Sequence, residues 1–186
     1  MITPEDLKDK LFALMRNGDL IDNTHRGEVA ELIVLEALGN RYEHAGGWGY
    51  ADIVSGPVTI QVKQAAKRQV WGQSKTLSYN IKKQKQYFEE DNLTVVLDTP
   101  ERLCNVYIFA MHNNPEIDAN HWDASQWVFC AVPTNALNEK FGDQKTVSFN
   151  VLQRYFEWVD YDNLAATVTT LRACFCSDPT QPPKTC

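Results

Sequence analysis

Hydrophobic and polar residues alternate without a break over residues 58–63, which read VTIQVK. A period of two predicts a strand with one buried side and one solvent-facing side. The tripeptide before it, Ser-Gly-Pro at 55–57, is typical of a turn. We therefore predict a β-hairpin over residues 51–63.

Most of the remaining chain divides into helical and strand-like patterns. Helices are expected over 3–18, 23–40, 79–89, 134–142, 151–156 and 160–175. Further strands are expected over 41–44, 105–112, 126–134 and 145–150. This order predicts an α/β fold in which a central mixed β-sheet is flanked by helices.

The helix expected over 23–40 has apolar residues around most of its circumference, so we expect it to be largely buried. Asn23 or Thr24 would cap its start, and Gly39 would end it. Its polar residues fall within one narrow arc at about 100° per residue. These residues are His25, Glu28, Glu31 and Glu36.

Length and composition predict one globular domain over residues 1–176, followed by a disordered tail over 177–186. No apolar run approaches the roughly 20 residues of a membrane span, and the first residues lack the order of a signal peptide. We therefore expect a cytoplasmic protein without a membrane partner. The net charge of −6 counts against a protein that coats nucleic acid broadly, but leaves room for a DNA enzyme with a local basic face.

The five cysteines are odd in number, which argues against a closed disulfide framework. Cys104 and Cys130 lie in apolar runs and are expected to be core thiols. Cys174 and Cys176 form a C-x-C pair, but no second pair stands nearby, which disfavours structural zinc.

The predicted hairpin places three polar groups on one surface. If residues 55–58 form the loop, Val54 pairs with Thr59 and Asp52 lies opposite Gln61. Directly opposed residues have Cβ atoms about 4.5–5.5 Å apart. Lys63 follows two positions later on the same face.

A carboxylate, an amide oxygen and an ammonium group suit phosphodiester hydrolysis. Mg²⁺ prefers oxygen ligands, and Asp52, Gln61 and the backbone carbonyl of Val62 would supply them. A bound metal polarises the scissile phosphate and lowers the pKa of a bound water. Lys63 would orient or deprotonate that water and stabilise transition-state charge.

The sequence from Gly27-Glu28 through Asp52 to Gln61-Val62-Lys63 resembles the PD-(D/E)XK nuclease superfamily in its Q-x-K variant. Ala51 stands where the motif has proline, and Gln61 stands where it usually has an acid. The resemblance implies a restriction-endonuclease-like core and a metal-dependent deoxyribonuclease that uses Mg²⁺, or Mn²⁺ in its place. It implies that Glu28 is a further metal ligand and catalytic residue. It also implies a DNA substrate, a restriction or defence role, and a homodimer.

Each of these residues has a plainer interpretation. Asp52 could end a strand, Lys63 could be a solvated strand residue, and Glu28 could stabilise the helix dipole. Glu31, in the same arc as Glu28, is either a second site carboxylate or a solvent contact. A second hypothesis for the whole chain is a catalytically silent nucleic-acid-binding or structural subunit with the same fold, which Gln61 and the acidic pI favour.

Basic residues cluster after the predicted hairpin and are candidates for contacts with DNA phosphates. They are Lys67, Arg68, Lys75, Lys82, Lys83 and Lys85. A solvated helix face is an equal explanation for the last three. Trp71 either stacks on a base or wedges a duplex, or it anchors a loop to the core.

Overall fold

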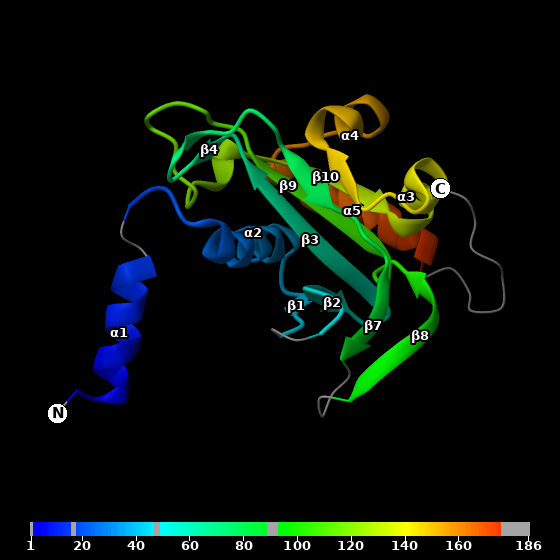
Figure 1. The fold of residues 1–186 in the computed structure, drawn as a ribbon, viewed down its shortest axis with the longest axis horizontal. Coiled ribbons are helices and arrows are strands. Elements are labelled where there is room, and N and C mark those ends of the chain that lie inside the picture. The colour runs from blue at the N-terminus through cyan, green and yellow to red at the C-terminus, as the bar shows by residue number, and fades with distance from the viewer. Residues whose placement is uncertain (1, 16–17, 47–48, 89–92, 176–186) are drawn as a thin grey trace.

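The computed structural model describes residues 2–15, 18–46, 49–88 and 93–175. Its central mixed sheet has five strands in the order β1-β2-β3-β9-β10 (Figure 1). These strands are β1 (Glu43–His44), β2 (Ile53–Ser55), β3 (Val58–Ala66), β9 (Val106–His112) and β10 (Trp127–Pro133). The helices are α1 (Pro4–Met15), α2 (Asn23–Leu38), α3 (Thr134–Phe141), α4 (Phe149–Tyr155) and α5 (Tyr161–Phe175). The predicted α/β class with a central mixed sheet flanked by helices is confirmed.

Three two-stranded sheets accompany the central sheet. They pair β4 (Arg68–Gln69) with β5 (Gly72–Gln73), β6 (Ser78–Asn80) with β11 (Thr146–Ser148), and β7 (Gln84–Phe88) with β8 (Thr94–Glu101). The β7–β8 hairpin projects from the body of the molecule (Figure 1). The extent of the predicted single domain stays a prediction, and the predicted tail lies outside the described residues.

The predicted hairpin register is confirmed. β2 and β3 pair antiparallel, with Val54 opposite Thr59 and Ile53 opposite Ile60. On its other edge β3 runs parallel to β9, which pairs antiparallel with β10. β3 is therefore the central strand, and β2 pairs only with its first three residues, 58–60.

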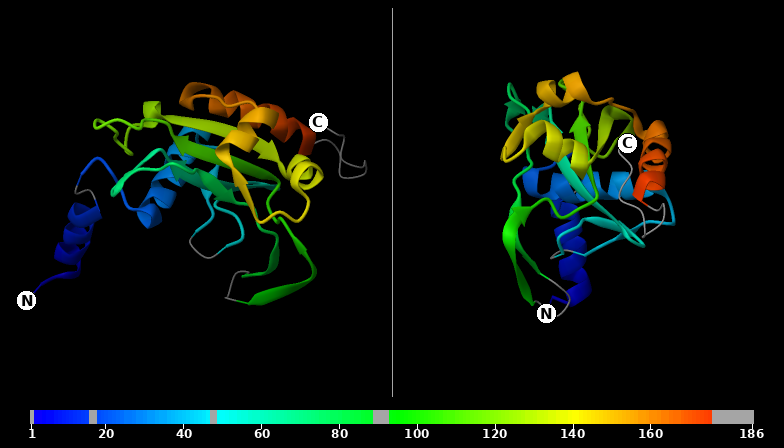
Figure 2. Two further views of the ribbon diagram at one scale, coloured as in Figure 1. Left: turned by 45° about the horizontal axis from the view of Figure 1, so that its top comes forward. Right: turned by 90° about the vertical axis from the view of Figure 1, so that its right-hand side faces the viewer.

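Each face of the sheet has its own core. On one face, Ala30 and Val34 of α2 and Leu164 and Val168 of α5 belong to one cluster with apolar side chains of β2, β3, β9 and β10. The opposite face buries residues of β6, β11, α3 and α4. The right-hand view of Figure 2 shows α3 and α4 apart from α5, on the other side of the sheet. Gln61 and Lys63, which alternate with Ile60 and Val62 along β3, belong to this second face.

The helix predicted over 79–89 is wrong. This segment contains β6 and β7, joined by an extended stretch. Tyr79 and Ile81 are both buried in the second core, and this spacing of two is that of a strand. The prediction also missed β8. The strand predicted over 145–150 ends at Ser148, and α4 begins at the next residue.

α2 differs from its prediction at its start and in the exposure of Leu32. Asp22 caps the helix, because its side chain accepts hydrogen bonds from the backbone N–H groups of Thr24 and His25. Leu32 is exposed, whereas the other apolar residues of the helix are buried or packed against the core, so the predicted burial holds apart from this position. The buried face includes a charged residue, Arg26.

The Arg26 guanidinium fixes the start of α2 against the sheet. Its Nε donates to Gln64 Oε1 of β3 at 2.7 Å, and its Nη1 donates to Gln69 Oε1 of β4 at 2.6 Å. Its Nη2 donates to Asn23 Oδ1 at 2.8 Å. Burial lowers the pKa of Arg26 to about 10. The three side-chain acceptors are neutral amides, so charge-assisted hydrogen bonds set the position of α2 over β3.

The two cysteines expected to be core thiols are confirmed as buried. Cys104 and Cys130 are buried, and burial raises the pKa of each thiol to about 12. Both remain protonated at neutral pH and are therefore poor nucleophiles. Cys176 lies outside the described residues. Among the helices of the described ranges, none has the length and apolar character needed to cross a membrane.

Two buried histidines join α2, β4 and the loop before β10. His121 Nδ1 accepts from the backbone N–H of Ile21 at 2.9 Å, and its Nε2 donates to the carbonyl of Arg68 at 3.1 Å. His112 Nε2 donates to the carbonyl of Asn120 at 3.0 Å, and the two rings lie 4.7 Å apart. Burial and, to a smaller extent, the neighbouring His112 lower the pKa of His121 to about 4. Burial also lowers the pKa of His112.

We predict that acid destabilises this fold between pH 6.5 and pH 4. Over that range the unfolded chain binds a proton at His121 that the folded chain does not, so stability is lost as the pH falls. Urea titrations at pH 7 and pH 5 should show a drop of about 2 kcal/mol in the free energy of unfolding. His25→Gln, at an exposed histidine, should keep this drop, and His121→Gln should lose most of it. Equal stability of the wild type at both pH values would contradict the prediction.

Candidate active site

Asp52 lies just before β2, at the point where the pairing with β3 stops. Its backbone N–H donates to the Ile60 carbonyl at 2.9 Å. Its Oδ2 accepts from the backbone N–H of Val62 at 2.7 Å and from Gln61 Nε2 at 2.5 Å. The hairpin therefore brings Asp52 and Gln61 into direct contact, as its register predicted.

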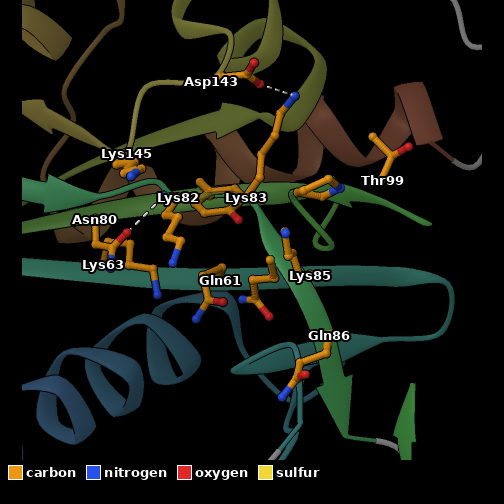
Figure 3. Close-up of a pocket in the computed structure, with 13 residues that line it drawn as sticks. Gln61, Lys63, Asn80, Lys82, Lys83, Lys85, Gln86, Thr99, Asp143 and Lys145 are labelled. Atoms are coloured by element: carbon orange, nitrogen blue, oxygen red, sulfur yellow. Dashed lines mark hydrogen bonds and ion pairs between the residues drawn. The ribbon is translucent and has the colours of Figure 1, made fainter. Parts of the chain in front are cut away.

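Lys63 and Gln61 open onto the same cavity. Both lie on β3 two residues apart, so they share one face of the strand. They line a cavity of about 810 Å³ together with residues of β7, β8, β9 and the segment before β11. Figure 3 shows both side chains beside the translucent β3 ribbon, with the lysines of the other segments around them. Lys63 is therefore part of the wall of the cavity and could contact a group that reacts inside it.

Glu31, rather than Glu28, is the carboxylate of α2 that interacts electrostatically with this site. Burial and the charge of Asp52 raise the pKa of Glu31, whereas its hydrogen bond with His44 and the charge of Lys63 oppose the rise. Its side chain is 21% exposed, and Oε2 lies 3.0 Å from His44 Nε2. Glu28 is 61% exposed and contacts His25 of its own helix at 3.2 Å. Glu31 is thus partly buried and within electrostatic range of Asp52 and Lys63, whereas Glu28 lies at the surface.

His44 orients the Glu31 carboxylate. Its Nδ1 accepts from the backbone N–H of Gly46 at 3.1 Å, which leaves the proton on Nε2 when the ring is neutral. Nε2 therefore donates to Glu31. A hydrogen bond of this kind holds a metal-binding carboxylate in one orientation.

Glu31→Gln and Glu28→Gln form a matched pair on one helix. We expect Glu31→Gln to weaken Mn²⁺ binding by about tenfold or more, because it removes one of two anionic oxygen groups. Glu28→Gln should bind Mn²⁺ within twofold of the wild type. Isothermal titration calorimetry with Mn²⁺ measures both. Weaker binding in Glu28→Gln with unchanged binding in Glu31→Gln would restore Glu28 as the ligand.

The oxygen atoms of Asp52, Glu31 and the Val62 carbonyl are of the kind that a hard divalent cation prefers. No group of three or more His, Cys, Asp or Glu side chains suited to a metal occurs within the described ranges. Mg²⁺ is commonly held by only one or two carboxylates and keeps several waters, and Asp52 with Glu31 meets that requirement. Carbonyl groups along a strand point alternately to its two edges. The Thr59 carbonyl accepts from the Asn105 N–H, on the β9 edge, and the Ile60 carbonyl accepts from the Asp52 N–H, on the β2 edge. The Val62 carbonyl therefore points to the β2 edge, where Asp52 lies.

The cavity is strongly basic in a protein that is acidic overall. Its lysines come from three separate parts of the chain: Lys63, Lys82, Lys83, Lys85 and Lys145. Lys83 forms an ion pair with Asp143 at 2.8 Å, and Figure 3 shows its side chain turned toward that carboxylate. Among the described residues no ion pair is formed by the other four. The cavity therefore offers several ammonium groups to a polyanion next to Gln61 and Lys63.

The remaining basic candidates lie at a different place. Lys67, Arg68 and Lys75 belong to the β4–β5 hairpin and its flanks, beyond the end of β3. Arg68 Nη1 donates to the Pro115 carbonyl at 3.2 Å. The six predicted DNA-binding residues thus form two groups, one in the cavity and one at the hairpin.

Sequence reasoning missed Lys145 and Tyr107, which also line the cavity. Burial raises the pKa of Tyr107, so its phenol remains a hydrogen-bond donor. Both residues reach the cavity through pairing between segments far apart in the chain. Tyr107 of β9 pairs with Gln61 of β3, and β11, just after Lys145, pairs with β6. The apolar run over 105–112 predicts the strand but not its neighbour in the sheet.

Comparison with known proteins adds no assignment. No protein-family model matches the chain, and a search of curated proteins finds no match.

Proposed function

We propose that this protein is a Mg²⁺-dependent DNA endonuclease with a restriction-endonuclease-like core of the PD-(D/E)XK superfamily, Q-x-K variant. One observation carries the proposal: Asp52 contacts Gln61, which together with Lys63 lines a cavity rich in lysines. An acid, an amide and a lysine at this spacing form the motif of that superfamily. Their contact across the hairpin supports the proposal, since the motif requires these groups to be neighbours in space.

Asp52 and Glu31 would hold the cation, with Gln61 and the Val62 carbonyl as neutral oxygen donors. The Gln61 amide now donates to Asp52, and a half-turn about its last bond would present its oxygen instead. When bound, Mg²⁺ supplies charge that polarises a phosphate and lowers the pKa of a coordinated water. The Val62 N–H keeps the Asp52 carboxylate in place in either state.

Lys63 acts on the reacting phosphate and water. Its ammonium group can donate hydrogen bonds to the attacking water and to the phosphate oxygen that gains negative charge. At Lys63, β3 is paired with β9 opposite Phe109, and the β2 ladder holds the start of the same strand, so the base of this side chain is firmly supported. A rigid support of this kind keeps the ammonium positioned before the substrate arrives.

The surrounding surface favours a nucleic acid as the substrate. Lys82, Lys85 and Lys145 surround the same cavity and are available to phosphates on either side of the scissile one. We propose DNA and a restriction or defence role. Cleavage of both strands requires two sites, which a two-fold homodimer supplies. α1 is exposed over residues 4–14 and offers Leu7, Leu11 and Leu14 as an apolar face for such contact.

The test is incubation of the protein with a mixture of plasmid and phage DNA in Mg²⁺, Mn²⁺ or EDTA. We expect discrete fragments with either metal and none with EDTA. Uniform degradation would keep the hydrolase and remove the restriction role. Matched RNA and branched DNA substrates in the same buffers would reassign the substrate if they alone are cut.

One observation favours the catalytically silent subunit as a second candidate. The Asp52 carboxylate already accepts two hydrogen bonds, from Gln61 and Val62, and is therefore satisfied as a structural group. A silent subunit would cut none of these substrates with any metal. Its lysine-lined cavity would still bind nucleic acid in EDTA.

A further inference from the structure

The β4–β5 hairpin carries an exposed tryptophan at its tip. Val70 and Trp71 form the two-residue connection between β4 and β5, and Gly72 adopts a φ of +128° directly after them. Trp71 is 72% exposed and Val70 is 51% exposed. The ring does not anchor this loop to the core, which removes the plainer of the two interpretations of Trp71.

Polar contacts at the base of the β4–β5 hairpin hold it in place, and the tip residues Val70 and Trp71 take no part in these contacts. Gln73 Nε2 and Arg68 Nη1 both donate to the Pro115 carbonyl, at 3.0 Å and 3.2 Å. Gln69 is buried and accepts from Arg26, as described above. Two large apolar side chains are thus presented to solvent on a rigid support, which costs little entropy when they bind a partner.

The charges beside the tip suit a polyanion. Lys67, Arg68 and Lys75 flank the hairpin, and within the described ranges none of them forms an ion pair. The adjoining loop carries Glu116 and Asp118, so the basic hairpin rather than that loop is the side that phosphates would approach. An aromatic ring among basic side chains is the usual combination for contact with bases and phosphates together.

We infer that the β4–β5 hairpin enters a groove of duplex DNA and that Trp71 packs against its bases. This inference rests on the proposed function for the identity of the ligand. The major groove admits a two-stranded β-ribbon, and apolar side chains can wedge between base steps. Trp71 follows Lys63 by eight residues, so at about 3.3 Å per residue the two lie at most about 26 Å apart. At about 3.4 Å per base pair, Trp71 would therefore contact DNA at most about eight base pairs from the cleaved bond.

The experiment measures the affinity of a fluorescein-labelled duplex of about 30 base pairs by anisotropy, in EDTA so that no cleavage occurs. Trp71→Ala should weaken binding by at least tenfold, the loss of one base–aromatic contact, and Trp71→Phe should recover part of it. Leu93→Ala, a control at an exposed apolar side chain just before β8 that is 63% exposed, should bind as the wild type does. Thermal melting should be unchanged in all three variants, because both positions are exposed.

The outcomes separate this inference from the proposed function. Trp71→Ala that binds and cleaves as the wild type does would overturn the role of the hairpin and leave the nuclease intact. Loss of binding in Trp71→Ala, with no cleavage by the wild type in any metal, would support the hairpin and overturn the nuclease. A loss of affinity for single strands alone, with duplex binding unchanged, would overturn the groove contact.

Discussion

Lys63→Met will bind duplex DNA within about threefold of the wild type and cleave it about a thousandfold more slowly. The substitution keeps an unbranched chain of similar length and removes only the ammonium group. The other lysines of the cavity still attract phosphates, so binding changes little; they are Lys82, Lys85 and Lys145. The charge and hydrogen bonds that Lys63 supplies to the transition state are lost, and such groups contribute about 10²–10⁴ in rate.

The control for this prediction is Lys82→Met, at an exposed lysine of the same cavity. This variant should weaken binding and lower the dependence of affinity on salt by about one counterion, with little change in the single-turnover rate. Single-turnover cleavage at saturating protein and anisotropy at several salt concentrations separate the two effects. A rate for Lys63→Met within tenfold of the wild type would mean that this lysine is only a phosphate contact.

Asp52→Asn will lose both metal binding and cleavage while keeping its fold. The amide oxygen that replaces Oδ2 can still accept from the Val62 N–H, so the melting temperature without metal should stay close to that of the wild type. Saturating Mn²⁺ stabilises the wild type by about 2.7 kcal/mol at 100 times its dissociation constant, which raises the melting temperature by several degrees. Asp52→Asn should show no such rise, and its cleavage rate should fall at least a thousandfold.

Asp143→Asn is the matched control, since it removes a carboxylate that pairs with Lys83 at the same cavity. It should retain the full Mn²⁺-dependent rise in melting temperature. Differential scanning fluorimetry with and without Mn²⁺ reports on the three proteins together. An equal rise in Asp52→Asn and the wild type would place the cation elsewhere.

The hairpin could be predicted because its information is local. An alternating strand and a Ser-Gly-Pro turn fix the register, and the register alone brings Asp52 to Gln61. The segment 79–89 could not be assigned in this way. β6 is a strand because it pairs with β11, with Tyr79 opposite Val147, and no local pattern indicates a partner so distant in the chain.

The choice between Glu28 and Glu31 depends on how α2 is rotated about its axis. The two residues lie in one polar arc, so the helical pattern does not distinguish them. Burial of Arg26 against Gln64 and Gln69 sets that rotation and leaves Glu31 within electrostatic range of Asp52. A charged residue on the buried face is the reverse of what hydrophobic patterning indicates.

The most direct measurement compares the wild type, Lys63→Met and Asp52→Asn, purified in parallel, in cleavage of one end-labelled duplex in Mg²⁺. We predict cleavage by the wild type alone, abolished by EDTA. No cleavage by the wild type in Mg²⁺ or Mn²⁺, or equal cleavage by all three proteins, would contradict a nuclease site at this hairpin.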